Sequence, residues 1–188
     1  MALNRLSTGP RIGLVLGAGG SVGLAYHGGV LDALATATGW DPRTAEVIVG
    51  TSAGSLTAAM LRGGLSAGDL AGISEDRPLS PEGEEVRRRS SLHNPRFALG
   101  EFLKVRPLAD PRAVFEAVLR PWSRRPAAAL AALLPAGAIS TLPISAGLDA
   151  SYGDDWPPAT WICAVRLRDG RRIVFGREGA PPTTMGSA

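Results

Sequence analysis

Histidine and cysteine are scarce in this chain. It carries two histidines, His27 and His93, and a single cysteine, Cys163, among 188 residues. An intramolecular disulfide and a cysteine metal site are therefore excluded. Cys163 lies in an apolar run, which predicts a buried strand position rather than a nucleophile.

An excess of charge of one sign is also missing. The 20 basic residues, of which Lys104 is the only lysine, face 17 acidic ones, and the net charge is +3. This balance does not favour nucleic-acid binding. The one basic run, Arg87 to Arg89, predicts a solvated loop or helix face, and contact with anionic lipid headgroups is the alternative.

Long apolar runs are scarce as well, and no signal peptide is visible. Residues 126–148 carry no charge, but Pro135, Gly137 and Pro143 interrupt them, so a membrane span is not predicted. We expect a buried or lid-like helix followed by a loop, with a lipid-contacting patch as the alternative. The expected location is cytoplasmic, with peripheral contact to a membrane.

The first sixty residues alternate between short apolar segments and helical patterns. Residues 12–16 predict a strand, residues 17–23 a glycine-rich turn, and residues 24–38 a helix. A second strand is predicted over 45–49 and a second helix over 52–61. This order predicts an α/β fold, with a doubly wound, mostly parallel sheet and helices on both faces.

The remaining segments are assigned by their local patterns. Residues 66–69 indicate a further helix start, and a hairpin is expected where two apolar segments flank Asp169-Gly170. The other expectations are an exposed loop over 76–95, a helix over 111–119 and a loop over 147–158. Residues 1–10 are expected to form a loose tail, and residues 11–188 a single domain.

The most specific motif is Gly50-Thr51-Ser52-Ala53-Gly54, which matches G-x-S-x-G. It follows a strand and opens a helix, as a nucleophile elbow does, and such a serine has a strained backbone. The flanking glycines, Gly50 and Gly54, let strand and helix approach without a Cβ collision. We therefore interpret Ser52 as a nucleophile, and the alternative is an ordinary helix N-cap.

The second motif is the glycine loop, which runs from Gly17 to Gly23 as G-A-G-G-S-V-G. A dinucleotide fingerprint requires a glycine where Val22 stands, and a phosphate-binding P-loop requires a lysine that is missing. The backbone N–H groups of such a turn can instead bind an anion. The loop then forms an oxyanion hole for Ser52, because both motifs follow strands of one presumed sheet.

A general base for Ser52 is not evident. A Ser-His-Asp triad of the hydrolase kind needs an acid and then a histidine after the serine. His27 precedes Ser52, and His93 lies in a charged, loop-like region. A conventional triad is not favoured, and we expect His27 to have a packing or hydrogen-bonding role.

The segments "GLVLGAGGSVGLAYHGGVLDAL" and "VIVGTSAGSLTAAML" together resemble the patatin-like phospholipase family over about residues 12–62. That family uses a Ser-Asp dyad without histidine. The resemblance implies that Ser52 is the nucleophile. It also implies that the backbone of Gly19, Gly20 and Ser21, with the N–H of Ala53, holds the oxyanion.

The chain departs from the family pattern in two places. In the loop, Ala18 stands at a position that is usually glycine, and Val22 replaces a basic residue. The family aspartate lies in D-G-[GA], whereas the only D-G here, Asp169-Gly170, is followed by Arg171 and explained by a hairpin turn. We therefore expect the chain to be the N-terminal part of a longer domain, with the catalytic aspartate beyond residue 188. Within the chain, weaker candidates for the role of that aspartate are Asp149, Asp154 and Asp155.

These observations predict a serine acyl hydrolase that cleaves fatty-acyl esters of lipids or phospholipids through an acyl-enzyme on Ser52. The alternative is a non-catalytic, lipid-binding or regulatory module of the same fold. A nucleotide-binding domain is a third class, which the loop spacing disfavours. We expect no metal or organic cofactor, no nucleic-acid partner, a lipid or acyl-ester substrate and a transient contact with membrane surfaces.

Overall fold

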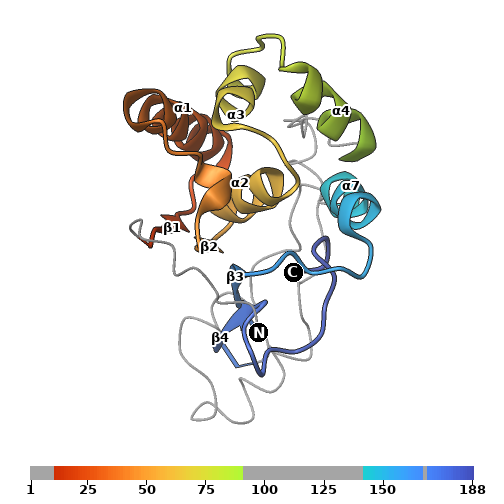
Figure 1. Cartoon of the computed structure of the whole chain (residues 1–188). Helices are drawn as coiled ribbons and strands as arrows, with labels where there is room; N and C mark the ends of the chain where they lie inside the picture. Colours follow the sequence, from red (N-terminus) through yellow and green to blue (C-terminus); the bar gives the residue numbers. More distant parts are fainter. Residues whose placement is uncertain (1–10, 91–141, 167–168) are drawn as a thin grey trace, which may run out of the picture. The chain divides into compact units, whose positions relative to one another are not determined.

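The chain is an α/β protein with an open sheet of four strands, in the order β1-β2-β3-β4. The computed structural model describes residues 11–90, 142–166 and 169–188 (Figure 1). The fold divides into two compact units. The first comprises Met1–Gly83 with Ala159–Trp161, and the second Glu84–Pro158 with Ile162–Ala188. The expected tail over residues 1–10 lies outside the described residues.

Two parallel strands form the centre of the first unit. β1 (Gly13–Leu16) pairs with β2 (Val47–Gly50), with Leu14 opposite Ile48 and Leu16 opposite Gly50. Leu16 and Ile48 are buried, and α2 (Ala53–Arg62) packs on both strands. Val15 alternates with Leu16 and is 83% exposed. A helix layer over that second face, which the sequence suggests, stays a prediction.

The first helix, α1 (Gly20–Thr38), begins four residues earlier than expected. The sequence predicts that residues 20–23 belong to the glycine-rich turn, but the N–H of Gly23 donates to the Gly19 carbonyl oxygen at 2.8 Å and closes a helical turn. The earlier start is possible because Gly20 adopts a φ of +57°. Gly39 ends the helix in the left-handed region with φ 70°, as the sequence predicts.

The helices of the first unit pack tightly on one another. α1 contacts both α2 and α3 (Ala67–Ser74), and the three lie side by side in Figure 1. A Cβ on Gly28 of α1 would lie 2.9 Å from backbone atoms of Leu70 and Ala71 in α3. The two helices therefore meet backbone to backbone at Gly28. A short 3-10 helix, η1 (Pro42–Thr44), connects α1 to β2.

The predicted start of α3 is confirmed by a capping box. The Ser66 hydroxyl accepts from the N–H of Asp69 at 3.1 Å, and the Asp69 carboxylate accepts from the N–H of Ser66 at 3.1 Å. Asp69 is buried and also accepts from the N–H of Ser80 at 2.7 Å. One carboxylate thus fixes the start of α3 and the turn after that helix.

The prediction of a loop over residues 76–95 is wrong for its middle part, because residues Pro81–Ser90 form a helix, α4. Proline at the first position suits a helix start. Ion pairs one turn apart stabilise the rest of the helix: Glu84 pairs with Arg87 at 2.7 Å, and Glu85 pairs with both Arg88 and Arg89. The basic run therefore lies on a helix, where its arginines are paired with acidic residues of the same helix.

A further helix and most of the expected hairpin belong to the second unit. α7 (Leu142–Tyr152) includes residues 147–152, so the loop predicted over 147–158 is wrong in its first part. β3 (Thr160–Val165) and β4 (Arg172–Phe175) pair antiparallel, with Cys163 opposite Val174, as predicted. Cys163 is half-buried rather than fully buried. The helix expected over 111–119 and residues 126–141 of the uncharged stretch lie outside the described residues.

Candidate active site

Ser52 stands at a strained turn between β2 and α2. Its backbone has φ 54° and ψ −117°, in the region with φ above zero that residues with a Cβ seldom adopt. It occupies the N-cap position of α2, but its side chain makes no capping hydrogen bond. The residue is exposed to solvent. Its geometry is therefore unlike that of an ordinary N-cap serine, which has extended backbone angles and whose oxygen accepts from the first turn.

The two glycines of the motif are required by close packing. A Cβ on Gly54 would lie 2.0 Å from the carbonyl oxygen of Leu16, at the end of β1. A Cβ on Gly50 would lie 2.6 Å from the carbonyl oxygen of Gly54. Real Cβ atoms do not approach backbone this closely, so only glycine fits at either position. This is the steric role that the sequence motif predicts for Gly50 and Gly54.

The glycine loop packs directly against this turn. The N–H of Gly54 donates to the Gly17 carbonyl oxygen at 3.0 Å, and the N–H of Thr51 donates to the Leu16 carbonyl oxygen at 3.1 Å. A Cβ on Gly23 would come within 3.3 Å of the Ala53 Cβ. The loop and the serine turn, which are separated by some thirty residues in sequence, thus form one site at the ends of β1 and β2.

The four backbone N–H groups that are predicted to hold the oxyanion have no hydrogen-bond acceptor among the described residues. They belong to Gly19, Gly20, Ser21 and Ala53. Gly20, Ser21 and Ala53 lie in the first turns of α1 and α2, where N–H groups have no partner inside the helix. Gly19, the N-cap of α1, has no side chain that could cap that helix. These donors and the two helix dipoles favour negative charge beside the serine turn.

His27 lies one to two turns into α1 and is buried. Its Nδ1 lies 3.1 Å from the hydroxyl oxygen of Thr57 in α2. Burial lowers the pKa of the imidazole below its usual value, which favours the neutral ring. The predicted hydrogen-bonding role is therefore confirmed, and the partner is a residue of the helix that Ser52 opens. His93 lies outside the described residues.

The carboxylates considered as substitutes for the missing base belong to the second unit. Asp149 accepts from the N–H of Gly186 at 3.0 Å, and Asp154 and Asp155 are exposed. Asp169 pairs with Arg166 at 2.5 Å and accepts from the N–H of Arg171 at 3.1 Å, as a hairpin-turn residue does. Among the described residues of the first unit, no side chain forms a hydrogen bond with the Ser52 hydroxyl.

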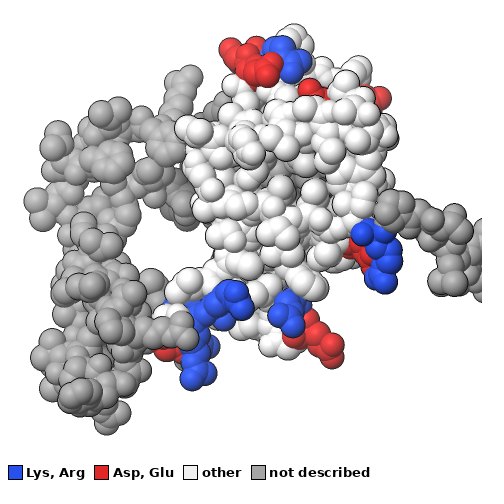
Figure 2. Space-filling model, turned by 90° about the vertical axis from the view of Figure 1, so that its left-hand side faces the viewer, with Lys and Arg blue, Asp and Glu red and all other residues white. Residues whose placement is uncertain are grey.

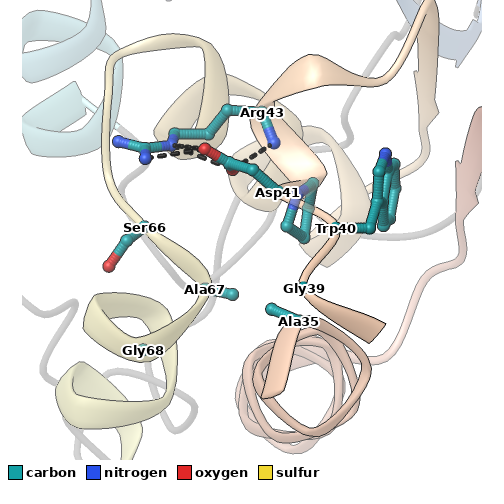
Figure 3. Close-up of a pocket in the computed structure, with 9 residues that line it drawn as sticks. Ala35, Gly39, Trp40, Asp41, Arg43, Ser66, Ala67 and Gly68 are labelled. Atoms are coloured by element: carbon teal, nitrogen blue, oxygen red, sulfur yellow. Dashed lines mark hydrogen bonds and ion pairs between the residues drawn. The ribbon is translucent and has the colours of Figure 1, made fainter. Parts of the chain in front are cut away.

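A separate hollow of about 190 Å³ lies at the other end of α1 (Figure 3). The end of α1, η1 and the start of α3 form it, and Trp40 and Asp41 contribute to its wall. Its one cation, Arg43, is paired with Asp41 at 2.7 Å. The hollow is smaller than usual ligand sites, and the length of α1 places it roughly 27 Å from the glycine loop. It takes no part in the site at Ser52.

Metal-binding clusters and membrane-spanning helices are both absent from the described ranges. Within them, no group of three His, Cys, Asp or Glu side chains gathers so that it could hold a metal ion. None of the helices in those ranges has the length and apolar character needed to cross a membrane.

One residue near the site, Thr57, is not singled out by the sequence, where it is only part of a predicted helix. A threonine four residues after Ala53 can donate its hydroxyl to that residue's carbonyl, and it does so at 3.1 Å. The spacing is therefore visible in the sequence, but the pairing with His27 depends on how α1 and α2 pack.

No family model, no curated protein and no solved structure matches this chain.

Proposed function

We propose that the chain is a serine acyl hydrolase of the patatin-like type, with Ser52 as its nucleophile. The observation that carries the proposal is the backbone of Ser52, which has φ 54° although its side chain caps no helix. Such strain costs about 1–3 kcal/mol and is typical of functional positions. The surrounding N–H donors supply what an acyl-transfer reaction requires beside a nucleophile.

The proposed reaction proceeds through an acyl-enzyme. The Ser52 oxygen attacks the ester carbonyl carbon, and its proton passes to a carboxylate. Negative charge develops on the carbonyl oxygen, where the N–H groups of Gly19, Gly20, Ser21 and Ala53 stabilise it. Collapse expels the alcohol, which takes the proton, and water then releases the acid by the reverse sequence. The family resemblance implies an aspartate as the proton acceptor.

A lipid ester is the proposed substrate, because an exposed apolar stripe begins within the glycine loop and continues along α1. Val22, Tyr26, Val30 and Leu34 follow one another at intervals of four residues, and all four are exposed, Val22 at 78%. Figure 2 shows the side on which α1 lies in Figure 1, with charged residues near its edges and uncharged residues across its centre. An apolar surface of this kind suits transient contact with a lipid interface.

Replacing Val30 tests the contact with lipid. We expect Val30→Asp to reduce turnover of an ester presented in vesicles by about tenfold, since an apolar contact is lost. Turnover of a water-soluble short-chain ester should not change, because Val30 lies more than two helical turns beyond the start of α1 and the oxyanion donors. Val30→Thr, which keeps the volume without the charge, is the matched control. Equal losses on both substrates would contradict a role at the lipid surface.

Labelling with a fluorophosphonate tests the nucleophile. We expect intact-mass analysis to show one adduct on the folded chain, none on Ser52→Ala, and an unchanged adduct on Ser55→Ala, a serine in the same helix. Unfolding the chain should abolish labelling, since the fold activates the serine. An adduct that persists in Ser52→Ala, or no adduct on the folded chain, would overturn the proposal.

The proton acceptor can be identified with the same reagent. Asp149→Asn, Asp154→Asn, Asp155→Asn and Asp169→Asn each remove one carboxylate of the second unit. A large fall in the labelling rate of a single variant would identify the acceptor. We expect no change in Asp169→Asn, because the hairpin accounts for the contacts of Asp169.

The second candidate function is a non-catalytic module that binds lipid through the same site. It is favoured by the Ser52 hydroxyl, which has no carboxylate partner among the described residues of the first unit. In this case the chain would bind vesicles while failing to label with the fluorophosphonate. The two experiments together therefore separate the candidates.

A further inference from the structure

His27 and Thr57 form a buried polar link between α1 and α2. His27 is 8% exposed and Thr57 is 1% exposed, and the His27 Nδ1 lies 3.1 Å from the Thr57 hydroxyl oxygen. Neither residue has a part in the reaction described above. Polar groups buried in this way are costly unless paired, so we expect the link to have a specific role.

The direction of the hydrogen bonds follows from the single hydrogen of the hydroxyl. Thr57 donates that hydrogen to the Ala53 carbonyl oxygen at 3.1 Å. Its oxygen must then accept from His27, whose Nδ1 carries the proton. Both the neutral ring and the imidazolium can donate from Nδ1, and burial, which lowers the pKa of His27, favours the neutral ring. A directed chain thus runs from His27 through Thr57 to Ala53.

This series of hydrogen bonds ends on a peptide group of the serine turn. The carbonyl of Ala53 is held by Thr57, and the N–H of the same peptide, on Gly54, donates to the carbonyl oxygens of Gly17 and Thr51, each at 3.0 Å. Both ends of the peptide are therefore fixed. Together with the helical φ and ψ of Ala53, its orientation sets the direction of the adjoining Ala53 N–H, which has no acceptor among the described residues.

We propose that His27 and Thr57 are positioning residues, which orient the Ala53 N–H toward the oxyanion by fixing the first turn of α2 against α1. The inference rests on the proposed acyl-hydrolase function. Neither side chain touches the substrate. The link also ties together the two helices whose first turns supply the oxyanion donors, so that the donors of the glycine loop and of Ala53 keep one geometry.

Two substitutions at Thr57 separate the polar link from packing. Thr57→Val keeps the shape of the side chain but removes the hydroxyl, so the His27 N–H loses its partner and the Ala53 carbonyl keeps only its bond from the helix backbone. Thr57→Ser keeps the hydroxyl and removes only a methyl group. His27→Asn retains an N–H donor near the position of Nδ1, whereas His27→Leu retains only the volume of the side chain.

The rate of Ser52 phosphonylation by a fluorophosphonate is the first readout. A misdirected oxyanion donor costs up to about a hundredfold in rate, so we expect Thr57→Val to label about 30-fold more slowly. Thr57→Ser should restore the rate to within about threefold, and His27→Asn should exceed His27→Leu. On a soluble ester, kcat should fall with little change in KM, because the donor acts in the transition state. Equal rates for Thr57→Val and Thr57→Ser would overturn the inference.

Amide hydrogen exchange provides a readout that does not depend on activity. We expect the Gly54 N–H to exchange faster in Thr57→Val than in Thr57→Ser, while amides of α3 serve as an internal control for folding. Unchanged Gly54 exchange would overturn the positioning role even if labelling fell. A failure of the unchanged chain to label Ser52 would overturn the proposed function, and the catalytic role of the link with it. The exchange data would then still report whether the link holds the turn.

Discussion

The helices α1 and α2 begin differently from α3, although all three follow turns of small residues. The N-cap residues Gly19 and Ser52 provide no side-chain hydrogen bond, and no acidic residue lies in the first turn of either helix. α3 begins with the reciprocal capping box of Ser66 and Asp69. The first turn of α3 is thus satisfied from within the chain, whereas those of α1 and α2 keep N–H donors for a ligand.

The backbones at these starts differ in the same way. Ser66 has extended angles, with φ −73° and ψ 165°, which suit a capping serine. Ser52 has φ 54°, and Gly20 has φ 57° at the start of α1. The contrast teaches that two serines before helices can have opposite effects: Ser66 stabilises its helix, whereas Ser52 costs stability and is expected to be kept for reactivity.

The largest expected effect comes from filling the space at the serine turn. In Gly54→Ala, the new methyl group would lie 2.0 Å from the Leu16 carbonyl oxygen. We expect the free energy of unfolding to fall by about 3 kcal/mol or more, measured by urea denaturation. Gly29→Ala in α1 is the matched control, because its Cβ meets nothing within 4 Å; it should be neutral or stabilising. Similar losses in both variants would contradict the close packing.

Removing the cap of α3 should also destabilise the chain, but without loss of reactivity. Asp69→Ala deletes the acceptor for Ser66 and Ser80, and we expect a loss of about 2–3 kcal/mol in the free energy of unfolding. The labelling rate of Ser52 should not change under conditions where the variant is folded. Ser66→Ala should cost about 1 kcal/mol. A labelling rate that falls with Asp69→Ala would break the contrast between the two kinds of helix start.

Replacing Ser52 should have the opposite effect: labelling is lost while the stability of the fold increases. We expect Ser52→Gly to abolish labelling and to raise the free energy of unfolding by about 1 kcal/mol, since glycine relieves the strain at φ 54°. Gly20 has φ 57° and open space around its Cα, so Gly20→Ala should lower the free energy of unfolding by about 1 kcal/mol. Thermal and urea unfolding of both variants measure this. A destabilised Ser52→Gly would show that the turn stores no strain.

The smallest expected effect is a pH dependence carried by His27. Because burial lowers its pKa in the folded chain, the unfolded chain binds more protons just below the usual value of about 6.5. The stabilisation is therefore present above about pH 6.5 and is lost as the pH falls toward the folded pKa. The free energy of unfolding should fall relative to that of His27→Asn over this window. A constant difference between pH 8 and pH 5 would exclude the effect.

The pattern of the chain predicts much of the first unit. The order strand, helix, strand, helix follows from short apolar runs bounded by glycine, and Gly39 and Ser66 mark helix ends as their chemistry requires. The hairpin around Asp169 and Gly170 is equally clear. α4 is not predicted, because the Pro and Ser content of this segment indicates a loop, although its Glu and Arg residues lie three or four positions apart, as in a helix. Residues 147–152 are not predicted as helix either, because Gly147 and Asp149 suggest a loop, although they lie within α7.

The sequence by itself determined the candidate nucleophile and the glycines around it, because a serine between two glycines at a strand-to-helix junction is typical of a nucleophile elbow. Only the tertiary structure decided which groups surround it. The contact of Gly17 with Gly54, and the link from His27 through Thr57 to Ala53, join residues some thirty positions apart. Such contacts depend on how β1, β2, α1 and α2 pack against one another, and periodicity within a single segment carries no information about that packing.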